Sequence, residues 1–176
     1  MRKVIKFGLS ADEIQRAIDE VEKFKAEFQT KVDTCRKRIA EEIAAYASMY
    51  FGNAVMEDVI YGSPRKPEVT VDFDHKGDIS VVVAHGEDAV WCEFGAGVYH
   101  NGSVGSSPNP YGKALGFKIG SYGEGRGGQQ VWGYYTDPVN KTGLVLTHGT
   151  PASMPMYNAA MEVLRKSVEI AREVFQ

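Results

Sequence analysis

The 176-residue sequence contains little cysteine, no long hydrophobic run and no excess of positive charge. Cys35 and Cys92 alone cannot build a disulfide framework or a four-cysteine zinc site. No apolar run approaches the roughly 20 residues that cross a bilayer, and the N-terminus lacks the apolar core of a signal peptide. The net charge of −3 argues against a dedicated nucleic-acid-binding protein. We therefore expect a soluble intracellular protein with reduced thiols and no membrane partner.

Signatures of enzyme and cofactor sites are also scarce. No two of the four histidines have the close spacing of metal ligands. The glycine run at 123–128 precedes a predicted strand rather than a helix, which is the wrong context for a dinucleotide loop, and no Gly-Lys-Ser/Thr sequence occurs. We expect no catalytic, cofactor or metal site. One alternative stays open, a hydrolase in which Cys92 acts with His100 or His148, although its apolar surroundings favour a core cysteine.

The first feature that the sequence does contain is a long amphipathic helix, predicted over residues 10–51. Ser10 and Glu13 form a capping box at its start, and Gly52 suits its end. About 40 residues at 1.5 Å each make a rod of roughly 60 Å, which is long for a small domain. We therefore expect part of it to pack on a neighbouring subunit. Apolar residues recur every three or four positions from Ile14 to Tyr50.

A basic cluster stands out on this helix, because residues 1–50 otherwise balance ten Lys/Arg against nine Asp/Glu. Such a cluster is typical of contact with phosphate or an acidic partner, and a nucleic-acid-binding module is the second alternative function. We favour a solvated helix face, because the net charge is negative. The cluster consists of Lys31, Arg36, Lys37 and Arg38.

A small sheet is predicted next. Residues 68–74 and 78–84 alternate with period two around a tight connection, which indicates a β-hairpin. Asp72 and Asp74 fall on one face of it, which we interpret as the solvent face rather than a cation site. Glu87 and Asp88 suit the start of a short helix that ends at Gly95.

A glycine-rich insert occupies residues 98–130. Twelve of the nineteen glycines lie between Gly95 and Gly133, and a loop of this length is usually functional. Aromatic side chains next to glycine make good interface anchors once ordered. The predicted interface residues are Tyr99, Tyr111, Phe117, Tyr122 and Arg126.

Two strands and a helix complete the predicted fold. The strands cover residues 131–135 and 143–147, and the helix runs to about Val174, with Ser153 as its cap and Pro155 in its first turn. The fold class is therefore α+β. A long N-terminal helix and a C-terminal helix pack on a small, mostly antiparallel sheet in a single domain over residues 1–176.

Two short turns carry a family resemblance. At residues 91–97 and 151–156 the sequence resembles the neck, or tail-completion, proteins that join head and tail in long-tailed bacteriophages. The order of predicted elements follows that family along most of the chain, although the insert is long and Met156 stands where an aromatic residue is common. The matching residues are Glu93, Phe94, Gly95 and Gly97 in the first turn and Pro151, Ala152 and Pro155 in the second.

The resemblance implies a structural role in virion assembly. Such proteins form a ring around the DNA channel at the head–tail junction and have no catalytic residues. The implied partners are further copies of this chain, connector or head-completion proteins and tail proteins, with DNA only as the contents of the channel. The implied location is the virion of a phage or prophage, after assembly in the cytoplasm of the bacterial host.

Overall fold

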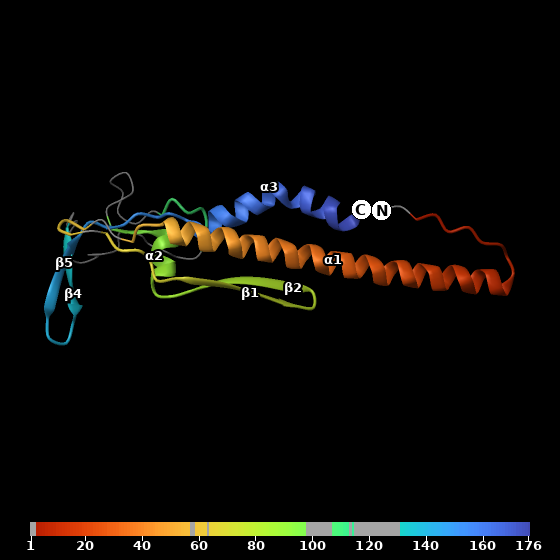
Figure 1. Cartoon of the computed structure of the whole chain (residues 1–176), viewed down its shortest axis with the longest axis horizontal. Helices are drawn as coiled ribbons and strands as arrows, with labels where there is room; N and C mark the ends of the chain where they lie inside the picture. The colour runs from red at the N-terminus through yellow and green to blue at the C-terminus, as the bar shows by residue number, and fades with distance from the viewer. Residues whose placement is uncertain (1–2, 57–58, 63, 98–106, 113, 115–130) are drawn as a thin grey trace.

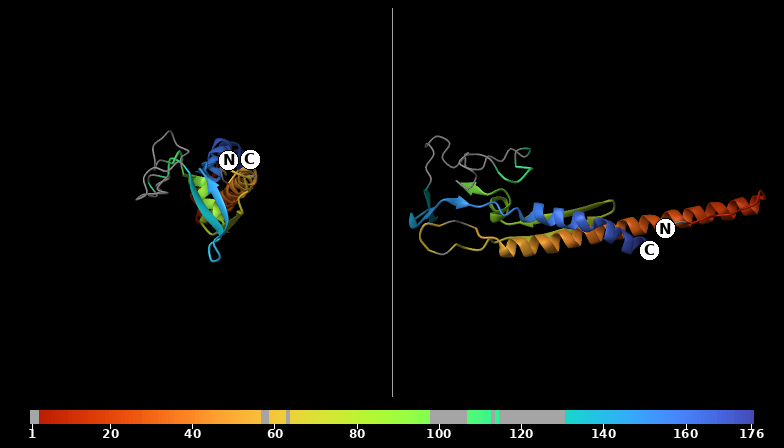
Figure 2. Two further views of the ribbon diagram at one scale, coloured as in Figure 1. Left: turned by 90° about the vertical axis from the view of Figure 1, so that its left-hand side faces the viewer. Right: turned by 90° about the horizontal axis from the view of Figure 1, so that it is seen from above.

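A computed structural model describes residues 3–56, 59–62, 64–97, 107–112, 114 and 131–176. The described elements form an elongated molecule along the long helix α1, Ala11–Asn53 (Figure 1). Helix α3, Pro155–Phe175, packs along one side of α1, and a β-hairpin packs along another side. Figure 2 shows the same arrangement from the end and from above. The α+β class predicted from the sequence is confirmed.

Helix α1 begins and ends close to the predicted positions. The Ser10 hydroxyl accepts the Glu13 backbone N–H at 3.4 Å, as predicted for the cap, and it donates to the Glu13 carboxylate at 2.5 Å. The helix ends at Asn53, where the Ala54 N–H bonds to the carbonyls of Tyr50 and Phe51. Its buried positions are mostly alanines, and small side chains allow a second helix to approach closely. These positions are Ala17, Ala40, Ala44, Ala47 and Phe51.

The first hairpin pairs β1, Thr70–Lys76, with β2, Ile79–His85, in antiparallel register, with Phe73 opposite Val82. Gly77 in the two-residue connection has a positive φ of 56°, which glycine adopts without strain. The strands lie one or two residues further along the chain than predicted. Helix α2, Asp88–Phe94, follows as expected.

The second hairpin pairs β4, Trp132–Asp137, with β5, Thr142–Thr147. It lies at the end of the molecule where α1 finishes (Figure 1). A short pairing joins β3, Ala96–Gly97, to β6, Gly149–Thr150. The described strands therefore form three separate two-stranded sheets rather than one small sheet, because the first hairpin packs along α1 whereas the second lies beyond the end of that helix. Outside the named strands, β5 makes one further antiparallel bridge, between Thr147 and Val59.

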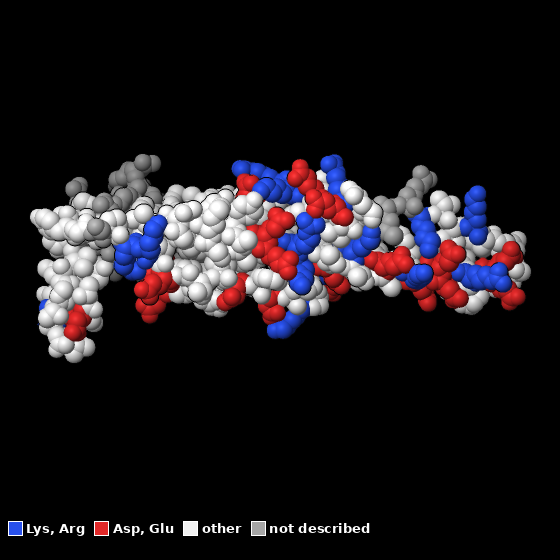
Figure 3. All heavy atoms as spheres, in the orientation of Figure 1, with Lys and Arg blue, Asp and Glu red and all other residues white. Residues whose placement is uncertain are grey.

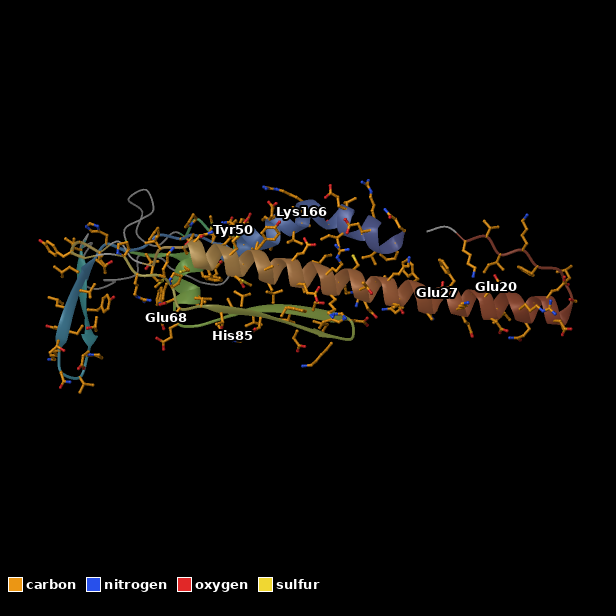
Figure 4. All side chains as sticks on the ribbon, viewed as in Figure 1. Glu20, Glu27, Tyr50, Glu68, His85 and Lys166 are labelled. Atoms are coloured by element: carbon orange, nitrogen blue, oxygen red, sulfur yellow. The ribbon has the colours of Figure 1, made fainter. Side chains whose placement is uncertain are left out.

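The core lies where the end of α1, helix α2 and the first residues of α3 meet. Helix α3 buries Ala159, Val163 and Ile170, whereas Leu164 and Val168 are exposed. The Lys166 ammonium lies 4.6 Å from the centre of the Tyr46 ring, which links α3 to α1; Figure 4 labels Lys166. The central core residues are Phe51, Ala54, Met56, Ala89 and Cys92.

Candidate functional site

The two turns that carry the family resemblance meet in space. Glu93, near the end of α2, directs its buried carboxylate at the start of α3. It accepts the backbone N–H groups of Met156 at 2.8 Å and Tyr157 at 3.0 Å. The Asn109 side-chain amide donates a third hydrogen bond at 2.7 Å. Glu93 therefore caps a helix that begins more than sixty residues later in the chain.

The backbones of the two motif turns also lie in direct contact. Gly95 has a φ of 76°, and a Cβ at this position would lie 2.8 Å from the Ala152 nitrogen and 2.9 Å from the Thr150 carbonyl oxygen. Only glycine fits both this conformation and this space. The Cys92 carbonyl accepts the N–H groups of Ser153 at 2.9 Å and Met154 at 3.2 Å.

We call this contact region the turn junction. It consists of the seven motif residues Glu93, Phe94, Gly95, Gly97, Pro151, Ala152 and Pro155 together with Asn109.

Two carboxylates of α2 lie in opposite electrostatic situations. Burial raises the pKa of Glu93, although its three hydrogen bonds oppose this shift. Asp88 is also buried, but the Arg65 guanidinium donates two hydrogen bonds to it, at 2.6 and 2.9 Å, and lowers its pKa. The Glu68 N–H donates to the same carboxylate at 2.9 Å. Asp88 thus fixes the chain before β1 to α2, as Glu93 fixes α3 to α2.

The predicted cap of α3 was wrong. Met154, with a φ of 52°, occupies the N-cap position, and no side chain of its own caps the helix. Ser153 lies one residue too early, and its buried Oγ has no hydrogen-bond partner among the described residues. Glu93 supplies the capping carboxylate instead. Sequence reasoning missed this role and that of Asn109, because neither residue lies near α3 in the chain.

Cys92 has the environment of a core residue. Its side chain is fully buried and its Sγ lies 3.4 Å from Met56 Sδ. Burial raises the pKa of the thiol to about 12, so very little nucleophilic thiolate exists at neutral pH. His100 lies outside the described residues. This environment gives no support to the alternative of a cysteine hydrolase.

Each side chain of the basic cluster has a partner within the chain. Arg36 lies 3.1 Å from Asp78 and 3.3 Å from Asp33, which brings the tip of the first hairpin to α1. Arg38 pairs with Glu173 at 2.8 Å. Lys31 donates to the carbonyl of Gln176 at 2.8 Å, and Lys37 lies 3.7 Å from Glu41. These contacts connect the middle of α1 to the tip of the first hairpin and to the end of α3.

Most predicted interface residues cannot be placed, because Tyr99, Phe117, Tyr122 and Arg126 lie outside the described residues. Tyr111 is described, and it is exposed. Its ring lies edge-on to that of Tyr157, with 6.1 Å between centres, and its N–H donates to the Asn109 side chain at 2.9 Å. This part of the insert is therefore anchored at the turn junction.

The N-terminal part of α1 extends beyond the rest of the molecule (Figure 1). Phe175, at the end of α3, contacts Phe28 with 5.4 Å between ring centres, so residues 11–27 continue past α3. Figure 4 labels Glu20 and Glu27 on this stretch. An arm of residues 3–9 runs back beside it. We call residues 3–28 the overhang.

The overhang exposes many apolar side chains. Between its arm and its helix lies a cavity of about 500 Å³, lined mainly by Ile5, Phe7, Ile14, Ile18 and Val21. Even with the arm in place, Val21 remains 53% exposed. Contiguous apolar surface on a soluble protein marks an interaction site. The exposed apolar residues are Val4, Phe7, Leu9, Ile14, Ile18, Val21 and Phe28.

Charged residues are distributed unevenly over the face seen in Figure 3. They gather over the overhang and the outer half of α3, whereas the end with the turn junction and the second hairpin is mostly uncharged. Among the described residues, no helix is long and apolar enough to cross a membrane. Within the same residues, no three His, Cys, Asp or Glu side chains are grouped to hold a metal ion.

Comparison with protein-family models, with curated proteins and with solved structures gives no match to this chain.

Proposed function

We propose that this protein is a structural component of a phage head–tail junction, a neck or tail-completion protein that assembles into a ring around the DNA channel. The observation that carries the proposal is the overhang. In a single chain, residues 11–27 of the roughly 65 Å helix, about two fifths of its 43 residues, extend past α3 with the arm of residues 3–9 beside them. The overhang exposes seven large apolar residues, four on its helix and three on its arm, and their burial in an assembly would stabilise that assembly.

The turn junction is a second observation that supports the same proposal. The two motif turns lie against each other, because Glu93 accepts hydrogen bonds from the first turn of α3 and Gly95 lies against Ala152. Each described interaction there positions backbone or packs a core, and none exposes a reactive group. A subunit of this kind has a packed turn junction at one end and an exposed apolar surface, the overhang, at the other. The proposed partners are connector and tail proteins as well as further copies of this chain.

The test is the size and shape of the purified full chain. Sedimentation velocity and light scattering across a concentration series should show a shift from monomer to one discrete oligomer, and negative-stain micrographs of that species should show rings with an open centre. A monomer at every concentration would contradict self-assembly. Irregular aggregates without rings would contradict the head–tail role.

A further inference from the structure

Residues 107–112 of the glycine-rich insert form a compact turn that is held by its own side chains. Asn109 lies at its centre and is only 3% exposed. Its backbone N–H donates to the Ser107 hydroxyl at 3.1 Å, and its carbonyl accepts the Gly112 N–H at 2.9 Å. Its side-chain oxygen accepts the Tyr111 N–H at 2.9 Å. We call residues 107–112 the insert segment.

The insert segment is attached to helix α2 at two points. The Ser107 hydroxyl donates to the carbonyl of Phe94 at 2.9 Å. The Asn109 side-chain amide donates to the Glu93 carboxylate at 2.7 Å, and both of these side chains are buried. Because a buried polar group is unfavourable without a hydrogen-bond partner, the amide and the carboxylate each stabilise the position of the other.

The first turn of α3 depends on the same carboxylate. Pro155 has no N–H, so the N–H groups at the start of this turn that need a partner outside the helix belong to Met156 and Tyr157. Both donate to Glu93. The Glu93 Oε1 atom that accepts the Tyr157 N–H also accepts the Asn109 amide. One carboxylate therefore holds the insert segment and the start of α3 together.

The charged and titratable groups around Glu93 are already neutral or paired. On α2, Asp88 is paired with Arg65, and the buried Cys92 thiol is neutral at neutral pH. The groups that reach Glu93 from α3 and from the insert segment are uncharged N–H donors. The position of this carboxylate is therefore set by those donors.

We infer that the insert segment and the first turn of α3 form one conformational unit coupled through Glu93, so that release of the insert segment loosens the start of α3. The coupling is a property of the single chain, so it stands or fails independently of the proposed ring. Tyr111 on the insert segment is exposed, and α3 packs along α1. Through this unit, a contact made at Tyr111 changes how firmly the start of α3 is held.

Ser107→Ala tests the coupling from a position that has no hydrogen bond to Glu93 or to α3 among the described residues. It removes the hydroxyl that joins the insert segment to α2. Amide hydrogen exchange at Gly112 reports on the insert segment, and exchange at Met156 and Tyr157 reports on α3. Exchange should become about threefold faster or more at both places. In an Asn109→Ala background, Ser107→Ala should cause no further change at α3, because the connection to Glu93 is already absent.

Asn109→Asp provides a second test with a titratable release. Two carboxyl groups in direct contact share a proton at low pH, whereas at higher pH both ionise and repel each other. After correction for the intrinsic pH dependence of exchange, protection should be lost on raising the pH. The loss at Gly112 and the loss at Met156 and Tyr157 should have the same midpoint. Two separate midpoints, or a loss at Gly112 alone, would overturn the coupling.

Asn140 offers the matched control for both substitutions at Asn109. Its side-chain amide also donates to a carboxylate at 2.7 Å, that of Asp137, but in the exposed turn of the second hairpin. Asn140→Ala and Asn140→Asp should leave exchange at the start of α3 unchanged. If Ser107→Ala speeds exchange in the insert segment and not in α3, the inference is wrong. Faster exchange to the same extent at Ala171, near the other end of α3, would indicate global destabilisation and would also overturn it.

Discussion

The turn junction and the overhang are two opposite ways of using apolar and polar residues. At the turn junction, Glu93 is buried and its carboxylate accepts three hydrogen bonds from other segments. In the overhang, apolar side chains such as Ile18 and Val21 are about half exposed, and the only buried residue of its helix is Ala17. The turn junction makes its hydrogen bonds within the chain, whereas the apolar side chains of the overhang are only partly covered by it.

This difference indicates where folding ends and assembly begins. A buried carboxylate is stable only when its hydrogen bonds are made, so the turn junction must form during folding. An exposed apolar stripe contributes little to the monomer, because the transfer of its surface out of water has not yet taken place. Substitutions at the turn junction should therefore change the stability of the monomer, and those in the overhang should change association.

Gly95→Ala should give the largest loss of stability. The new Cβ would contact backbone atoms of Thr150 and Ala152 and would require a left-handed φ, so we expect a loss of about 3 kcal/mol or more in the free energy of unfolding. Urea denaturation of the two proteins measures it. Gly52→Ala is the matched control, because this helical position has open space and should gain about 0.5–1 kcal/mol. Equal effects of both substitutions would contradict the close packing at the turn junction.

Glu93→Ala should be next in size. It leaves the N–H groups of Met156 and Tyr157 and the amide of Asn109 without their acceptor, which should cost about 2–3 kcal/mol. Hydrogen exchange should show that the first turn of α3 opens more readily. If exchange there stays as slow as in the wild type, Glu93 does not cap the helix.

The pH dependence of the two α2 carboxylates should have opposite signs. The pKa of Asp88 is lowered in the folded state, so its contribution to stability is present above its unfolded pKa of 3.8 and is lost as the pH falls through the folded value. The pKa of Glu93 is raised, so its unfavourable contribution at neutral pH disappears as the pH falls toward 4.5. The free energy of unfolding of the wild type, Asp88→Asn and Glu93→Gln, measured between pH 7 and pH 3, separates the contributions of the two carboxylates.

Asp88→Asn should lower stability by about 1–3 kcal/mol at pH 7, and its difference from the wild type should shrink on acidification. For Glu93→Gln, the stability of the wild type relative to the variant should instead rise as the pH is lowered. The same pH trend in both variants would contradict one of the two assignments.

Removal of apolar side chains from the overhang should have the smallest effect on the monomer. Ile18→Ala combined with Val21→Ala should change the free energy of unfolding by less than about 1 kcal/mol at concentrations where the protein is monomeric, because both side chains are about half exposed. Association should weaken clearly. A loss of several kcal/mol in the monomer would show that the overhang belongs to the folded core.

Much of the secondary structure was predictable because its signals are local. Ser10 and Glu13 are three residues apart, and the pairing of β1 with β2 follows from alternation around one tight turn. The basic cluster was correctly placed on the long helix, although its individual partners Asp78 and Glu173 come from distant parts of the chain.

The turn junction was only half predictable. The sequence identifies Glu93 and Gly95 as motif residues, and glycine at a helix end predicts a positive φ. That Glu93 caps α3, and that Gly95 lies against Ala152, depends on how α2 and α3 approach each other. Ser153 is the nearest capping residue in the sequence, and it failed because the backbone turns through Met154 before the helix begins.

The sequence by itself determined the elements of this protein: the long helix with Ser10 as its cap, one hairpin, two further strands, a short helix and a final helix. Their signals are periodicity and turn chemistry, which act over a few residues. Only the tertiary structure decided that the strands form three separate pairs, that Glu93 and Asn109 hold the start of α3, and which apolar residues stay uncovered. Those outcomes depend on contacts between segments far apart in the chain, for which a single sequence carries no local signal.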